Sequence, residues 1–179
     1  MKKQFRQVPG LSTFCSCLSY GGNVIDGEKK KAGALQLLLV LCNCPSGDDV
    51  PKSPCQTSAS LVAELWRQGN YSSEKNKGKI ITAYAMQKSL INEKLKSKDA
   101  CATIDAIQGT EYDNVLGDVG RNHGTGFLRD PRRFNVLVTR ARESLILVLS
   151  NAVGRTARSG SGHDYFNHIR SGCTSLKVI

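Results

Sequence analysis

The sequence predicts an α/β protein in which a mostly parallel sheet carries helices on both faces. Apolar runs bounded by turn residues alternate along the chain with segments of helical period, a pattern typical of this class. The run 35–41 is apolar on both of its alternating faces, as expected of an interior strand. A length of 179 residues suits one domain with one sizeable core, so a single domain over 1–179 is expected.

The elements follow one another in chain order. Further strands are expected at 78–84, 101–105, 113–119 and 145–149, and helices at 60–68, 86–95 and 131–142. Loops are expected at 45–54, which holds three prolines, and at the glycine-rich stretch 120–126, while 163–169 is amphipathic. Ligands of such sheets bind at the carboxyl ends of the strands, and the polar motifs are expected there.

The net charge of +10, from 25 Lys and Arg against 15 Asp and Glu, favours a polyanionic partner, nucleic acid or nucleotide before membrane. It disfavours a third possibility, a nucleotide-binding protein without nucleic-acid function. Every basic residue from 121 to 170 is Arg, whereas Lys dominates from 75 to 98. Arg is the better bidentate phosphate ligand. The Lys segment is either part of a binding surface or a solvated face.

No apolar run is long enough to span a bilayer, and no apolar stretch follows the N-terminal charges. We therefore expect an intracellular protein, cytoplasmic or nuclear, with free thiols and no membrane partner. Two Cys-x-Cys pairs, Cys15/Cys17 and Cys42/Cys44, leave a four-ligand zinc site as an alternative. Paired structural zinc ligands are usually separated by two or more residues, so no metal site is predicted.

Segment 130–142 carries the clearest candidate site. Asp130 suits a helix N-cap, and Pro131 suits the first helical position. Arg133 and Arg140 are two turns apart on the predicted helix and would project from one flank as a phosphate clamp. The alternative is a basic amphipathic helix whose arginines are solvated.

The same segment is similar to the sixth motif of superfamily 1 helicases, especially the up-frameshift (nonsense-mediated decay) and senataxin-like group. Run 103–113 resembles their fifth motif, 79–87 resembles a strand and helix start that usually reads I-T-P-Y-x-x-Q, and 4–14 resembles the Q-Y-R-M-H-P motif. The resemblance implies a three-layer RecA-like domain of the P-loop NTPase type. It would be the second motor domain of an ATP-dependent helicase, with the first motor domain absent from this chain.

In this family, ATP with Mg²⁺ lies between two RecA-like domains and is bound mainly by the first. Carried over by motif position, the catalytic arginine fingers would be Arg6 and Arg140. The implied nucleotide-binding residues are Phe5, Gln108, Gly109, Glu111 and Arg133. The implied nucleic-acid-binding residues are Thr82, Tyr84, Thr103 and Asp105.

The implied partners are single-stranded RNA or DNA and a first RecA-like domain, in cis or in trans. No segment reads G-x-x-x-x-G-K-[ST], and no acid pair follows an apolar strand as in a Walker B motif. The chain alone is therefore expected not to hydrolyse ATP.

Several positions depart from the family's pattern. Gln7 and Val8 stand where Met and His are usual, and Ala83 replaces Pro. Gly117 and Asp118 interrupt a strand that is apolar in relatives, which predicts either an edge strand or a less stable domain, because a buried Asp without a partner is unfavourable. These departures keep an alternative open, a non-catalytic nucleic-acid-binding or scaffold module derived from such a helicase.

Overall fold

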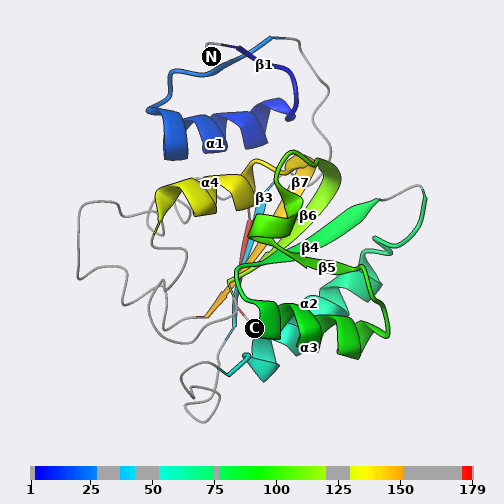
Figure 1. Ribbon diagram of the computed structural model, residues 1–179. Coiled ribbons are helices and arrows are strands. Elements are labelled where there is room, and N and C mark those ends of the chain that lie inside the picture. Colours follow the sequence, from blue (N-terminus) through cyan, green and yellow to red (C-terminus); the bar gives the residue numbers. More distant parts are fainter. Residues whose placement is uncertain are drawn as a thin grey trace.

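A six-stranded sheet forms the centre of the computed structural model, which describes residues 3–27, 37–42, 53–74, 77–119, 130–150 and 175–178 (Figure 1). The strand order is β5-β4-β6-β7-β3-β8, and every pairing is parallel. The strands are β3 (Leu37–Cys42), β4 (Gly78–Thr82), β5 (Cys101–Thr103), β6 (Tyr112–Asp118), β7 (Ala141–Ser150) and β8 (Ser175–Val178). The predicted α/β class with a mostly parallel sheet is confirmed.

The central strands are apolar on both sides because successive side chains enter two different cores. In β7, Leu145, Leu147 and Leu149 belong to one core, whereas Ile146 and Val148 belong to the other. Full burial of one such side chain contributes about 1.5–3 kcal/mol. This alternation explains why a strand without apolar/polar periodicity can lie inside a sheet that is covered on both faces.

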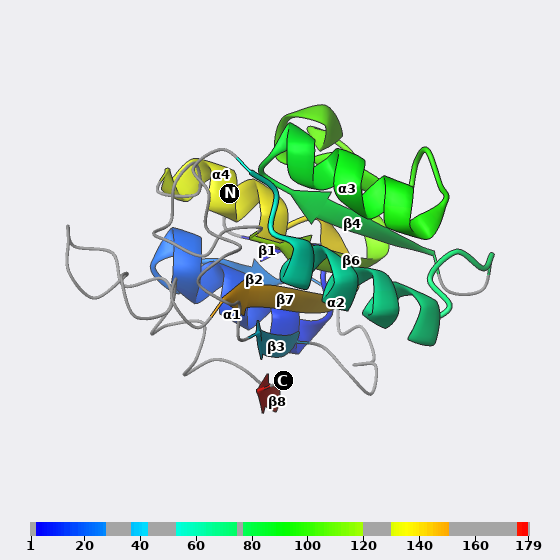
Figure 2. The same cartoon turned by 90° about the horizontal axis from the view of Figure 1, so that it is seen from below.

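Helices cover the two faces in pairs, which makes the domain three-layered as predicted. Helices α1 (Pro9–Tyr20) and α4 (Pro131–Val138) lie over one face, and α2 (Gln56–Gln68) and α3 (Ala85–Leu95) over the other (Figures 1 and 2). Leu11 and Phe134 anchor the first pair in one core, and Trp66 and Ile91 anchor the second pair in the other. A short parallel pair, β1 (Lys3–Gln4) with β2 (Ile25–Asp26), lies beside α1.

Helix α1 was not predicted from the sequence. Its residues include several weak helix formers such as Ser, Thr and Cys, so local propensity gives little signal. Pro9 at its start suits the first turn, where the missing N–H is not needed. Gly21 ends it with a left-handed backbone at φ 60°, which glycine adopts at little energetic cost.

Helix α4 ends at Val138, so the prediction of a helix over 131–142 is wrong at its C-terminal end. The Tyr112 amide donates to the Arg140 carbonyl at 3.0 Å, and Ala141 already pairs with β6. Strand pairing therefore competes successfully with the last helical turn. Thr139 closes the helix, because its amide and its hydroxyl both donate to the Asn135 carbonyl.

Strand β6 lies between β4 and β7, so the prediction that it could be an edge strand is wrong. Gly117 is needed there because of a close approach. A Cβ at this position would lie 2.7 Å from Leu137 Cδ2 and 2.8 Å from Leu147 Cδ2. The missing side chain thus lets α4 pack directly on the strand.

The predicted loop 120–126 and the amphipathic stretch 163–169 lie outside the described residues, as does most of the predicted loop 45–54. Within the described part of the chain, no helix combines the length and apolar character needed to cross a membrane.

Candidate functional site

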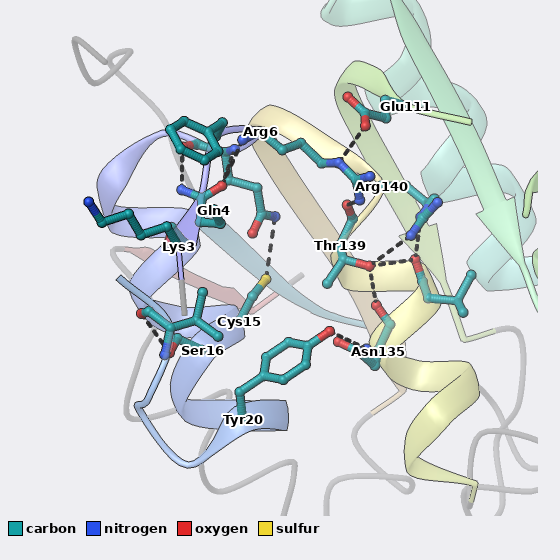
Figure 3. Close-up of a pocket in the computed structure, with 15 residues that line it drawn as sticks. Lys3, Gln4, Arg6, Cys15, Ser16, Tyr20, Glu111, Asn135, Thr139 and Arg140 are labelled. Carbon is teal, nitrogen blue, oxygen red and sulfur yellow. Dashed lines mark hydrogen bonds and ion pairs between the residues drawn. The ribbon is translucent and has the colours of Figure 1, made fainter. Parts of the chain in front are cut away.

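A cavity of about 450 Å³ opens where the N-terminal segment meets the end of α4 and the start of β6 (Figure 3). Its lining includes three cationic side chains, Lys3, Arg6 and Arg140, and one carboxylate, Glu111. The cavity therefore has an excess of positive charge, which suits an anionic ligand. We call it the arginine pocket.

Arg140 is held mainly by the turn that carries it. Its Nε donates to the Val136 carbonyl at 3.1 Å, its Nη1 donates to the Thr110 carbonyl at 3.1 Å, and its Nη2 donates to the Thr139 hydroxyl at 3.2 Å. These acceptors are uncharged, so the positive charge of the half-buried guanidinium is not neutralised by them. Two of its five N–H donors are not used by these bonds.

Arg6 reaches the same pocket from the N-terminal segment. Its Nε donates to Glu111 Oε1 at 2.6 Å, and its Nη1 donates to the Thr139 carbonyl at 3.1 Å (Figure 3). The side chains of this ion pair are 34% and 35% exposed, so neither charge is sealed inside the domain. Both arginines thus bond to the Thr139 region, although one precedes α1 and the other follows α4.

The two guanidiniums influence each other electrostatically. Burial lowers the pKa of Arg140, and the positive charge of Arg6 lowers it further, while Glu111 acts in the opposite direction. The guanidinium nevertheless remains protonated at neutral pH. Repulsion between two fixed cations is relieved when an anion binds between them, so the arrangement favours a polyphosphate.

Two glutamines hold the backbone that carries Arg6, a role that the sequence did not predict for either of them. Gln4 Oε1 accepts the backbone amides of Arg6 and Gln7, both at 2.8 Å. The Gln7 side chain is buried and donates to the carbonyls of Val138 at 3.3 Å and Ala141 at 3.1 Å. Gln7 therefore ties the segment of Arg6 to the turn of Arg140, at a position where relatives usually have Met.

Phe5 also lines the pocket and is 60% exposed. Its ring lies against Gly27, where a Cβ would come within 2.1 Å of Phe5 Cε1. In the same lining, Asn135 Nδ2 donates to the Tyr20 hydroxyl at 3.1 Å, which joins α4 to α1 (Figure 3). An exposed aromatic ring next to paired cations is suited to a ligand that combines a flat ring with phosphates.

The structure thus brings together four of the implied nucleotide-site residues, namely Phe5, Arg6, Glu111 and Arg140. Arg133 is not among the lining residues. The expected clamp of Arg133 and Arg140 on one helix flank is wrong, because α4 ends before Arg140. Gln108 and Gly109 are exposed in the turn after the 3₁₀ helix η2 (Ile104–Ile107) and lie outside the lining.

The polar motifs were expected at the carboxyl ends of the strands. This prediction is correct for the implied nucleic-acid-binding residues and wrong for the arginine pocket. Glu111 precedes β6 and Arg140 precedes β7, so the arginine pocket lies at the amino ends. The implied nucleic-acid residues lie at or just beyond the carboxyl ends of β4 and β5. They are Thr82, Tyr84, Thr103 and Asp105.

These four residues differ in accessibility. Asp105 is exposed, and Tyr84 and Thr103 are half-buried. Thr82 is fully buried, and its hydroxyl has no hydrogen-bond partner. Direct contact between Thr82 and a ligand is incompatible with this burial, which corrects the expectation for that residue. The accessible residues of the predicted set are Tyr84, Thr103 and Asp105.

Asp118 lies at the same end of the sheet and is completely buried, but it has partners. The Ser58 hydroxyl of α2 donates to Oδ1, and the Gln87 side-chain amide of α3 donates to Oδ2 at 2.6 Å. Gln87 also bonds to both backbone polar groups of Cys55. The buried carboxylate of Asp118 is therefore not without partners. Its hydrogen bonds form a polar network that joins β6 to α2 and α3.

The Cys15/Cys17 pair of the zinc alternative lies within the described residues. Cys15 is buried at the arginine pocket and Cys17 is exposed, so the two side chains of this pair do not face a common ligand. Within the described ranges, no group of three or more His, Cys, Asp and Glu residues is arranged to hold a metal ion. Cys44 lies outside those ranges, so the second pair of the zinc alternative is not described.

Comparisons with known proteins agree on one family. A family model described as an AAA domain (AAA_12) matches residues 1–152. "Regulator of nonsense transcripts 1" of Caenorhabditis elegans is 36% identical over 202 residues, which cover 96% of this chain and 18% of that protein. "ATP-dependent helicase NAM7" of Saccharomyces cerevisiae is 35% identical over 92 residues, covering 50% of this chain and 9% of that protein. The chain thus spans less than a fifth of the length of these curated relatives.

A solved structure agrees with the fold. The crystal structure of the C-terminal domain of a possible DNA helicase from Lactobacillus plantarum superposes with a TM-score of 0.60. The match covers 98% of both chains at 12% sequence identity. At this identity the likeness establishes the RecA-like fold and nothing about the ligands.

Proposed function

Because the chain belongs to the up-frameshift and senataxin-like group of superfamily 1 helicases, we propose that it is the second motor domain of an ATP-dependent helicase. The domain would span 1–179, with a first RecA-like domain supplied in cis or in trans. It would contribute positively charged side chains that contact a nucleotide bound by the other domain. It would also contribute a surface that binds nucleic acid.

One observation carries this proposal. Arg6 and Arg140, which are remote in sequence, reach one cavity from different elements, and both side chains remain partly accessible. Placing two arginine side chains in one pocket is electrostatically unfavourable without a ligand, because like charges repel. A pair of guanidiniums held by backbone carbonyls is suited to charge that develops during phosphoryl transfer.

The residues of the arginine pocket fit ATP. Arg6 and Arg140 would contact the terminal phosphates, Glu111 would accept hydrogen bonds from the ribose hydroxyls, and the exposed ring of Phe5 would pack near the base. Bound Mg²⁺ would neutralise phosphate charge. Because the sequence contains neither a Walker A nor a Walker B motif, we expect the chain alone not to hydrolyse ATP.

Single-stranded RNA or DNA would contact the opposite end of the sheet. Tyr84, Thr103 and Asp105 are accessible there, beyond β4 and β5. Hydroxyl and backbone groups at strand ends can bind sugars and phosphates without reading the sequence of bases. The separation of the two surfaces by the length of the strands matches a domain that links nucleotide binding to nucleic-acid binding.

The proposal is tested in a two-domain protein that joins this chain to a first motor domain carrying the phosphate-binding loop. Replacing Arg140→Ala should lower the rate of nucleic-acid-stimulated ATP hydrolysis by about a thousandfold or more. The matched control is Arg132→Ala on α4, whose side chain is 93% exposed, and it should leave the rate unchanged. Circular dichroism should be the same for both variants.

Unchanged turnover in Arg140→Ala would refute the assignment of this residue as a finger. The scaffold alternative makes a different prediction. In that case the two-domain protein would bind nucleic acid but would hydrolyse ATP no faster than the isolated first domain, whichever residue occupies position 140.

A further inference from the structure

A second hollow lies at the amino ends of β4, β5 and β6, where Tyr112 in its lining follows Glu111 of the arginine pocket in the chain. Its volume is about 650 Å³, in the range of small-ligand sites. The ends of α2 and α3 form its walls, and these helices lie side by side over one face of the sheet (Figure 2). None of its lining residues lines the arginine pocket.

The walls of this hollow are aromatic. Trp66 and Tyr71 contact each other with ring centroids 5.8 Å apart, and Tyr112 lines the same space. Glycines make room for the Tyr71 ring, because a Cβ on Gly69 would come within 2.0 Å of it and a Cβ on Gly78 within 2.7 Å of the Tyr71 Cβ. Rings placed in an open hollow offer apolar area to sugars and bases.

The rim of the hollow is cationic. Arg67, Lys77 and Lys79 contribute three positive charges to the lining, against one carboxylate from Asp99. Lys79 Nζ donates to the Asp99 carbonyl and lies 5.9 Å from the centroid of the Tyr112 ring, so its charge is held at the edge of the aromatic wall. Lys77 is exposed.

The lysine-rich segment of the sequence supplies much of this charge. Lys77 and Lys79 begin the segment that forms β4, and the turn after α3 adds the exposed Lys96 and Lys98 next to lining residues. The Arg67 guanidinium donates to the Lys94 carbonyl at 2.7 Å, which joins the two helix ends. Lys77, Lys79, Lys96 and Lys98 therefore come from two separate segments that meet at this hollow.

We propose that this hollow is a second binding site for single-stranded nucleic acid, which holds phosphates on Lys77, Lys79 and Arg67 and a sugar or base against Tyr71 and Tyr112. An acidic peptide would satisfy the cations but has no general use for the aromatic wall. A nucleic-acid strand uses both, because anionic phosphates alternate with flat rings along its length.

The site is tested in the 179-residue chain with a fluorescein-labelled oligouridylate and with an oligothymidylate of equal length, by anisotropy at low salt. Lys77→Glu should weaken binding about tenfold and should reduce the slope of log K against log salt by about one. Arg132→Glu changes the net charge by the same amount on the opposite layer, so it is the matched control. It should weaken binding by less than about twofold.

Ultraviolet crosslinking supplies a measurement that does not depend on folding of a variant. Crosslinked peptides should contain Tyr71 or Tyr112. Equal weakening by Lys77→Glu and Arg132→Glu, or crosslinks confined to other segments, would overturn the proposal. Displacement of the oligonucleotide by polyglutamate of equal charge, with equal affinity, would also overturn it in favour of an acidic-peptide site.

Nucleic-acid binding at the hollow can be tested separately from the proposed motor function. Tyr84→Ala tests the surface at the carboxyl ends of the strands and leaves the hollow intact. Loss of binding in Tyr84→Ala alone would support that surface and contradict the hollow, whereas additive losses in the two variants would support both sites.

Discussion

Charged side chains at the two ends of the sheet differ in their exposure and in their hydrogen-bond partners. At the amino ends, Arg6 and Arg140 remain half-exposed and bond to backbone carbonyls and to one partly exposed carboxylate. At the carboxyl ends, Asp118 is completely buried and bonds to side chains of two helices. The first arrangement leaves donors available to a ligand, and the second uses its acceptors to hold the layers together. Changes to Arg6 or Arg140 should therefore alter function, and changes to Asp118 should alter stability.

The largest effect outside the pocket is expected from Asp118→Ala. Removing the carboxylate leaves the Ser58 hydroxyl and the Gln87 amide buried without this acceptor, so the free energy of unfolding should fall by about 2–3 kcal/mol. Urea denaturation of the chain measures this loss. The exposed control Arg132→Ala should stay within about 0.5 kcal/mol of the wild type.

A double-mutant cycle with Ser58→Ala sharpens the interpretation. If the network acts as a unit, Ser58→Ala should be much less destabilising once Asp118 is already Ala. Full additivity of the two losses would show that the hydrogen bond between these side chains does not contribute.

An intermediate effect is expected from Gln7→Met, which introduces the residue usual in relatives. The change removes the donor that joins the Arg6 segment to the carbonyls of Val138 and Ala141. The free energy of unfolding should therefore fall by about 1 kcal/mol. In the two-domain protein, kcat should fall more than KM rises, because the spacing of the two arginines changes while the cavity remains. An unchanged kcat would mean that Gln7 has a structural role only.

The smallest effect concerns thiol reactivity. Burial raises the pKa of the Cys15 thiol to about 12, although its hydrogen bond from Gln7 acts in the opposite direction. At pH 8 the reactive thiolate of Cys15 is therefore scarce, whereas Cys17 is exposed two residues away. Iodoacetamide labelling followed by peptide mass spectrometry should modify Cys17 first. Equal labelling of the two thiols at pH 8 would contradict the burial of Cys15.

Much of the fold was predictable because strands and helices here follow the local periodicity of the sequence. Strand β3 and the end of α2 at Gly69 agree with their apolar patterns and turn residues. The end of α4 was not predictable in this way, since Ala141 lies at helical spacing from the apolar Phe134 and Leu137 but pairs with β6 instead. The clamp expected from the spacing of Arg133 and Arg140 failed for the same reason.

The amino-acid sequence by itself determined the class of the fold, the family and the identity of the arginines that reach the pocket. Those depend on residue order and on local hydrophobic pattern, which a linear chain displays directly. The tertiary structure alone decided that Arg6 and Arg140 share a cavity, that Asp118 has partners and that Thr82 is inaccessible. Each of these depends on contacts between segments distant in sequence, and such contacts are set by how the layers pack.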